Sequence, residues 1–169
     1  MAENTIQLLV DVINTLTNAH IKTWLFGGWA EELSGLRPRG PHRDIDLLYP
    51  AHSFELLDKF LQTHSDAEEI RLKRFSHKRA FRWHDILVEV FLVRPEPKGL
   101  ITDFFGIHRF AWPQDTLTHT VLLPCGEYPL ASPSAFRFYR ERHNDVEEAY
   151  RHAFAHRQPQ HTPCANTAT

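Results

Sequence analysis

The sequence predicts one domain of the α+β class, in which a mixed sheet is flanked by helices and followed by a C-terminal helix. Apolar residues recur at three- and four-residue intervals near both ends of the chain, as they do in amphipathic helices. Short aromatic and β-branched runs between these two segments are separated by polar turns and predict strands. The length of 169 residues suits one domain with its own hydrophobic core.

The first part of the chain predicts a helix, a strand and a second, short helix. Residues 4–19 have the spacing of an amphipathic helix, and Asn4 is its expected N-cap. Residues 23–26 predict a short buried strand that ends at a Gly-Gly pair, and residues 30–33 favour a helix. We expect the first helix to pack on the sheet.

A cationic loop then leads into a strand that carries two aspartates. Residues 36–43, LRPRGPHR, contain two prolines and three arginines, so an irregular segment with a local positive charge is expected. Residues 44–49 alternate with the period of a strand, which places Asp44 and Asp46 on the same face. Two neighbouring carboxylates repel each other when they are buried without a cation, so this pair is a candidate ligand set for a hard divalent cation.

The middle of the chain predicts a helix and an antiparallel meander. Residues 53–61 have a helical apolar face, and Ser53 is the expected cap. Strands are expected at 70–75, 79–83 and 86–93, and the arginines between positions 71 and 82 are expected to face solvent.

Glu89 is an isolated acid within the apolar run LVEVFL of the last of these strands. An unpaired charge in a buried strand is costly, so a nearby group should compensate it. A second interpretation places Glu89 on the solvent-facing side of an edge strand, where it needs no partner.

The C-terminal third is less regular until its final helix. Residues 104–107 and 116–123 are apolar enough to supply strands or a lid over a pocket. Ser132 followed by Pro133 marks the start of a helix that extends to about residue 156. Residues 157–169 are polar, contain two prolines and are predicted to be disordered.

Composition excludes several classes of protein. The formal charge is −2 with 24% charged residues of both signs, so a general nucleic-acid binder is not expected. Cys125 and Cys164 lie far apart in the sequence and do not predict a structural disulfide. The N-terminus lacks the basic region of a signal peptide, and no apolar run has the length of a membrane span, so a cytoplasmic protein without a membrane partner is expected.

Gly27 and Gly28 follow a strand and precede the cationic loop, an arrangement that suits a phosphate group. Without a Cβ atom, these residues let backbone N–H groups approach a triphosphate closely. The side chains that can neutralise its charge come from the adjoining loop: Arg37, Arg39, His42 and Arg43. Taken alone, a Gly-Gly pair is more often a simple turn, and His42 can serve to cap a turn.

Asp44, Asp46 and Glu89 together predict a metal site. Two Mg²⁺ ions held by these three acids would compensate the charge of Glu89 and place it near an incoming hydroxyl, as a base or as a metal ligand. Other metal sites are less favoured, because His152 and His156 have the spacing of a helical pair but lack a third ligand.

The aromatic residues allow two interpretations. Trp29, Trp83 and Trp112 are expected in the core or in a pocket wall, although an aromatic residue near the glycine turn, such as Trp29, can contact a nucleotide base.

In the order GGW, basic loop, HRDIDL and later acid in a strand, the chain resembles the lincosamide and aminoglycoside nucleotidyltransferases of the DNA polymerase β-like superfamily. The resemblance is clear over residues 22–50 and extends to Glu89. The charged segment at 140–147 is similar to the one that such proteins carry after the catalytic sheet. The chain departs from other branches of the superfamily at Gly28, where serine is common, and at Glu89, where aspartate is common. The loop before His42 is also one residue longer than the resemblance leads us to expect, with Gly40-Pro41 between Arg39 and His42.

The resemblance implies the polymerase β-like nucleotidyltransferase fold and its reaction. A substrate hydroxyl would attack the α-phosphate of an NTP co-substrate and release pyrophosphate, and the acceptor would be a small molecule, with antibiotics as the leading class. Asp44, Asp46 and Glu89 would bind Mg²⁺, while Gly27, Gly28 and Arg39 would contact the triphosphate. The implied organisation is a catalytic core at 1–130, a helical segment of the same domain at 131–156 and a tail at 157–169.

Two further features of the resemblance stay open. A site shared between two subunits of a homodimer is compatible with so short a chain. The alternative function is that of a non-catalytic or regulatory nucleotide-binding member of the same fold, such as a binding module or an antitoxin-type partner.

Overall fold

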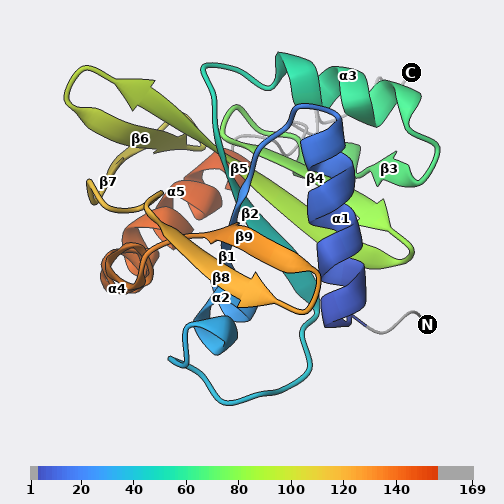
Figure 1. Ribbon diagram of the computed structural model, residues 1–169. Coiled ribbons are helices and arrows are strands. Elements are labelled where there is room, and N and C mark those ends of the chain that lie inside the picture. Colours follow the sequence, from blue (N-terminus) through green and yellow to red (C-terminus); the bar gives the residue numbers. More distant parts are fainter. Residues whose placement is uncertain (1–3, 156–169) are drawn as a thin grey trace, which may run out of the picture.

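The structure, a computed structural model, describes residues 4–155 and combines five helices with a mixed sheet of nine strands within that range (Figure 1). The helices are α1 (Ile6–Asn18), α2 (Gly27–Leu33), α3 (Glu55–Thr63), α4 (Pro133–Glu141) and α5 (His143–Ala155). The strands are β1 (Trp24–Phe26), β2 (Asp44–Pro50), β3 (Ala67–Glu69), β4 (Lys78–Trp83), β5 (Ile86–Glu96), β6 (Gly99–Phe104), β7 (His108–Trp112), β8 (His119–Leu123) and β9 (Gly126–Leu130). The predicted α+β class is therefore confirmed.

The sheet has the order β3-β4-β5-β2-β1-β9-β8, with the β6–β7 hairpin attached to the end of β5. Strand β2 runs parallel to β5 and antiparallel to β1, so it lies at the centre of the sheet between two hydrogen-bonded neighbours. This arrangement places Asp46 directly beside Phe26 on one side and beside Glu89 on the other. Residues that are far apart in the sequence thus meet at the middle of the sheet.

Apolar residues on β2 and β5 hold this centre together. Ile45 and Leu47 of β2 and Val88 and Val90 of β5 are fully buried, and they alternate with the acidic positions along each strand. Because side chains alternate between the two faces of a strand, burial of one face fixes the acids on the other.

Helix α1 lies across one face of the sheet (Figure 1), and its buried side chains recur at helical spacing: Leu9, Val10, Val12, Ile13 and Leu16. Its N-cap is Thr5, whose hydroxyl accepts from the amide of Leu8, so the predicted cap Asn4 is wrong by one residue. The Asn4 amide instead donates to the Asp44 carbonyl, because it lies beside the start of β2 rather than at the helix axis.

The predicted strand at 70–75 is wrong, because this segment forms a 3₁₀ turn at Arg71–Lys73 after the short strand β3. Ion pairs hold the turn: Lys73 contacts Glu89 at 2.7 Å, and Arg74 contacts Asp58 at 2.7 Å. Such long-range pairing is not encoded in the local alternation of apolar residues.

Arg79 is buried, which corrects the expectation that the arginines of this region all face solvent. Its guanidinium donates to both carboxylate oxygens of Asp58 on α3, at 2.6 and 3.1 Å, and lies 4.3 Å from the ring centre of Phe54. Burial of an arginine is tolerated when its donors are paired in this bidentate manner.

Two predicted helix boundaries also change. Helix α3 begins at Glu55 rather than Ser53, although the Ser53 hydroxyl still accepts from the Glu55 amide at 3.3 Å. Ser132 caps α4 through the Ala135 amide, as predicted, but the helix ends at Glu141 and α5 begins at His143, so one predicted helix is two. His156 and the tail at 157–169, which contains Cys164, lie outside the described residues.

Within residues 4–155, no helix combines the length and the apolar character that a bilayer crossing requires.

Candidate active site

The three acids singled out in the sequence line one cavity of about 420 Å³ at the centre of the sheet. Asp44 and Asp46 come from β2, and Glu89 comes from the adjacent strand β5 at the position paired with Asp46. The remaining walls are supplied by β1, α2, the cationic loop, β5, α4 and α5: Phe26, Gly27, Gly28, Glu31, Arg37, Phe91, Phe136, Tyr139, Arg140 and His143. The structure therefore joins the Asp-x-Asp pair, the later acid and the glycine turn, as the sequence predicted.

Position 27 requires glycine because the Asp46 carboxylate lies very close to it. Its backbone has a φ of +64°, and a Cβ atom added there would lie 2.1 Å from Asp46 Oδ2, well inside contact distance. At Gly28 an added Cβ would meet Arg37 Nη1 at 3.0 Å and His42 Nδ1 at 3.1 Å. The two glycines thus admit the carboxylate on one side and the basic loop on the other.

The two aspartates are held in an environment that disfavours their charge. Burial, followed by the negative charges of Asp44 and Glu89, raises the pKa of Asp46 to about 8. The pKa of Asp44 is raised as well, first by burial and then by Glu89. A cation bound between the carboxylates would remove this penalty, because it favours the charged form of each acid.

Glu89 is compensated by two lysines. Its Oε1 atom lies 2.7 Å from Lys73 Nζ, and Lys78 Nζ lies 3.3 Å from both of its oxygens. Within residues 4–155, no group of three acid, histidine or cysteine side chains is arranged to hold a metal ion. Coordination of a cation by all three acids would require Glu89 to exchange at least one lysine contact.

The cationic loop contributes unequally to the cavity. Arg37 lines it, whereas Arg39 and Arg43 are exposed and are not among its walls. Of the three arginines in this loop, Arg37 alone therefore lines the cavity, and phosphate contacts by Arg39 and Arg43 stay a prediction.

Trp29 and His42 organise the loop behind the glycine turn. Their rings stack with centroids 4.0 Å apart, and His42 Nε2 lies 2.9 Å from Glu32 Oε2, which also accepts from the Gly40 amide. The Trp29 indole donates to the Asn4 side chain, so its polar edge faces α1 and not the cavity. Trp29, Trp83 and Trp112 are all buried, as predicted for core residues.

Helices α4 and α5 close the cavity with residues that the pattern of acids and glycines does not reveal. Arg140 of α4 lies 2.7 Å from Glu31 of α2, so an ion pair bridges the cavity wall. Tyr139 also lines the cavity, and burial together with the charges of Asp46 and Glu89 raises its pKa to about 12. The charged segment at 140–147 was the available signal for Arg140, whereas Tyr139, Lys73 and Lys78 had none.

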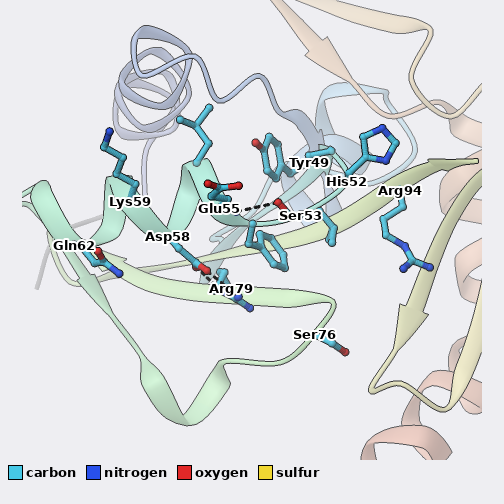
Figure 2. Close-up of a pocket in the computed structure, with 14 residues that line it drawn as sticks. Tyr49, His52, Ser53, Glu55, Asp58, Lys59, Gln62, Ser76, Arg79 and Arg94 are labelled. Atoms are coloured by element: carbon cyan, nitrogen blue, oxygen red, sulfur yellow. Dashed lines mark hydrogen bonds and ion pairs between the residues drawn. The ribbon is translucent and has the colours of Figure 1, made fainter.

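A larger, open depression of about 1130 Å³ lies beside α3 and does not carry the same chemistry (Figure 2). Figure 2 shows Asp58 directed at Arg79, its buried partner, and Ser53 bonded to Glu55. Among its walls, Asp58 and Arg79 form an ion pair, and the Asp44, Asp46 and Glu89 carboxylates are not among them.

Comparison with known proteins agrees with this geometry. The family model described as aminoglycoside-2''-adenylyltransferase matches residues 8–90, which include the glycine turn, both aspartates and Glu89 and amount to 83 of the 169 residues. A comparison with curated protein sequences finds no significant match.

Solved structures resemble the chain over most of its length. Lincomycin-bound LnuA, a lincosamide antibiotic adenylyltransferase, has a TM-score of 0.64 at 14% identity and covers 88% of this chain and 98% of its own. The chain has the nucleotidyltransferase fold. ANT(2'')-Ia in complex with adenylyl-2''-tobramycin has a TM-score of 0.59 at 15% identity, covering 90% of each chain. The Thermotoga maritima protein TM1012, assigned as a nucleotidyltransferase, has a TM-score of 0.58 at 17% identity, covering 90% of this chain and 93% of its own.

The nucleotidyltransferase fold confirms the resemblance that the residues 22–50 suggested. At 14–17% identity these structures establish the arrangement of elements, and the family match at 8–90 spans the glycine turn and all three acids.

Proposed function

We propose that this protein is an antibiotic nucleotidyltransferase, which moves a nucleoside monophosphate from an NTP to a hydroxyl of a small molecule and releases pyrophosphate. The observation that carries the proposal is the meeting of Asp44, Asp46 and Glu89 beside the Gly27 turn in one cavity. The adenylyltransferases LnuA and ANT(2'')-Ia share the fold, which favours ATP as the nucleotide and an antibiotic as the acceptor.

The residues present fit divalent cations, and we assign two Mg²⁺ ions to Asp44, Asp46 and Glu89. All three donors are carboxylates, the ligands that Mg²⁺ prefers. Burial, with the neighbouring carboxylates adding to it, raises the pKa of both Asp44 and Asp46, and a bound cation would favour their charged forms. Bound there, the ions would neutralise phosphate charge and polarise the α-phosphate.

The glycine turn is the proposed triphosphate site. Gly27 and Gly28 leave room for phosphate oxygens near the backbone, and Arg37 supplies a positive charge within the same cavity. Binding in this position would present the α-phosphate to the side of Asp46 that faces Glu89.

In the transfer step, the acceptor oxygen forms a bond to the α-phosphorus while the bond from that phosphorus to the bridging oxygen of the β-phosphate breaks. The leaving group is pyrophosphate, and the hydroxyl proton passes to the Glu89 carboxylate and then to solvent. Lys73 and Lys78 contact that carboxylate and hold it in position. Arg37, which lines the same cavity, can stabilise the negative charge that develops on the phosphates. No nucleophilic side chain of the enzyme takes part.

Pyrophosphate release tests the proposal. The protein is incubated with Mg²⁺, each NTP and a panel of lincosamides and aminoglycosides, and Asp46→Asn and Glu89→Gln are compared with the wild type. We expect release with at least one acceptor and a fall of about a hundredfold or more in each variant. Activity that survives both substitutions unchanged contradicts the assignment of the site.

A second candidate function, nucleotide binding without transfer, is favoured by one observation, the engagement of Glu89 by two lysines. It predicts that Mg²⁺-dependent NTP binding, measured by calorimetry, persists while no acceptor gives pyrophosphate.

For either function we propose a cytoplasmic location. We also propose that two subunits can form a homodimer, and analytical ultracentrifugation with and without nucleotide would test this.

A further inference from the structure

We propose that a second, aromatic cavity on the far side of Glu89 is the acceptor subsite, and that it selects an amphiphilic hydroxyl compound with at most one positive charge over a polycation. The inference rests on the proposed function, because it takes Glu89 as the group that receives the acceptor's proton.

The position of this cavity relative to Asp46 supports its role. In the register of the sheet, Asp46 has Phe26 and the glycine turn on one side and Glu89 on the other. If the triphosphate occupies the glycine side, an attacking hydroxyl must approach from the Glu89 side. The aromatic cavity, of about 180 Å³, opens there and shares Glu89, Phe91 and Tyr139 with the central cavity.

The walls of the aromatic cavity are predominantly apolar. They come from the start of β4 and the residue before it, β5, β6, the β6–β7 turn, α4 and α5: His77, Lys78, Glu89, Phe91, Phe104, Phe105, Tyr139, Val146, Glu147 and Tyr150. Phe105 and Tyr150 form an edge-to-face pair with centroids 5.4 Å apart. Tyr150 is 46% exposed, so a large apolar ring is left partly open at this end of α5. Such rings bind the apolar part of a ligand.

The charges at this cavity do not match a polycation. Its acids are Glu89, which already contacts Lys73 and Lys78, and Glu147, whose carboxylate lies 3.1 Å from His143 Nε2. A ligand with several ammonium groups would need several unpaired carboxylates and would be repelled by Lys78. One amine can be accommodated by the half-exposed Glu147.

The family match does not decide this question. It ends at residue 90, whereas seven of the ten residues that line the aromatic cavity follow that position. The name aminoglycoside-2''-adenylyltransferase therefore describes a similarity of the metal and nucleotide half, and the acceptor half must be judged from its own side chains.

The test compares acceptors that differ in charge. Steady-state pyrophosphate release is measured with saturating Mg²⁺ and ATP, using lincomycin as an amphiphilic monocation and tobramycin as a polycation. We expect kcat/KM for lincomycin to exceed that for tobramycin at least about tenfold. Equal or better use of tobramycin overturns the inference and leaves the proposed function standing, whereas no release with any acceptor overturns both.

A pair of variants tests the location. Tyr150→Ala removes an aromatic wall of the cavity, and Leu122→Ala removes an exposed apolar side chain of β8 that lines neither cavity. We expect Tyr150→Ala to raise KM for lincomycin about tenfold with KM for ATP unchanged, and Leu122→Ala to change neither by more than about twofold. An unchanged KM for lincomycin in Tyr150→Ala, or an equal rise in both variants, contradicts the assignment.

Discussion

Gly27 couples backbone conformation to the acidic site. Its φ of +64° suits glycine, and the space that a Cβ atom would occupy is taken by Asp46 Oδ2. The close approach of the two residues explains why a glycine turn and an Asp-x-Asp strand occur together, since neither could keep its position if the turn carried a side chain.

Gly27→Ala is therefore expected to abolish most activity and to destabilise the fold. Left-handed backbone alone costs a non-glycine residue about 1–2 kcal/mol, and displacement of Asp46 adds to this cost. Gly35→Ala is the matched control, because Gly35 has a φ of +71° and nothing within 4 Å of an added Cβ. Urea unfolding and pyrophosphate release of the two variants separate the clash from the backbone cost. Equal losses in both would show that the contact with Asp46 is unimportant.

The two lysines at Glu89 differ in the strength expected of their contacts. Lys73 is closer, at 2.7 Å, but its side chain is 43% exposed, whereas that of Lys78 is 14% exposed. Solvent screens an exposed pair, so Lys78→Met should reduce the free energy of unfolding by about 1–2 kcal/mol and Lys73→Met by less than about 1 kcal/mol. The exposed Lys59 provides a control substitution. Urea unfolding at pH 7 checks the order, and a larger loss for Lys73→Met would contradict it.

Single functional residues could be predicted where a charged side chain interrupts an otherwise apolar local pattern. Asp44, Asp46 and Glu89 stood out because a charge within an apolar strand demands a partner. Their lysine partners could not be predicted, because the 3₁₀ turn and the β4–β5 register that bring Lys73 and Lys78 to Glu89 depend on tertiary pairing.

At the scale of elements, His77 joins three strands. Only 3% exposed, it precedes β4, accepts from the Phe105 amide beyond β6 through Nδ1 at 2.9 Å, and packs against the rings of Phe91 and Phe104. Burial, with the charges of Lys78 and Arg79 adding to it, lowers its pKa to about 3. The folded protein therefore holds this imidazole neutral.

This neutral histidine predicts a loss of stability in acid. Between pH 6.5 and about 3 the unfolded chain binds a proton at His77 that the folded chain does not, so stability falls as pH falls through that window and is unaffected by His77 above it. The expected slope is up to about 1.4 kcal/mol per pH unit below pH 6. His77→Asn keeps an acceptor for the Phe105 amide without titrating. If urea unfolding from pH 7 to 5 gives the same slope for wild type and variant, the assignment of the slope to His77 is wrong.

Elements were predicted well where one local pattern dominates. The helix at α1, the aspartate strand β2 and the start of α4 follow from amphipathic spacing, alternation and the Ser132-Pro133 cap. The hairpins formed by β6 to β9 could not be placed, because their short strands acquire their partners only in the folded sheet. The break between α4 and α5 at Arg142 could not be predicted either, because no proline or glycine marks it in the sequence.

In the folded molecule as a whole, the sheet gathers Asp44, Asp46 and Glu89 at its centre. Positively charged side chains of the protein compensate only part of this negative charge. Glu89 has its lysines, but burial and the neighbouring carboxylates raise the pKa of Asp46 to about 8. Because this pKa lies above that of the unfolded chain, the folded state without a cation loses stability as pH rises from about 4 to 8. At pH 8 most of that cost is present.

Mg²⁺ binding should relieve this cost and stabilise the whole fold. A ligand at a hundred times its Kd adds about 2.7 kcal/mol, so Mg²⁺ with a non-hydrolysable ATP analogue should raise Tm at pH 8 by several degrees. Asp46→Asn removes one buried carboxylate, and its Tm without metal should exceed that of the wild type while its response to Mg²⁺ is lost. Differential scanning calorimetry with Mg²⁺, with the analogue and with both measures each contribution. A Mg²⁺ response that is the same in Asp46→Asn would place the cation elsewhere, whereas a lower Tm of the metal-free variant would mean that Asp46 stabilises the apo fold and that its charge is compensated without a cation.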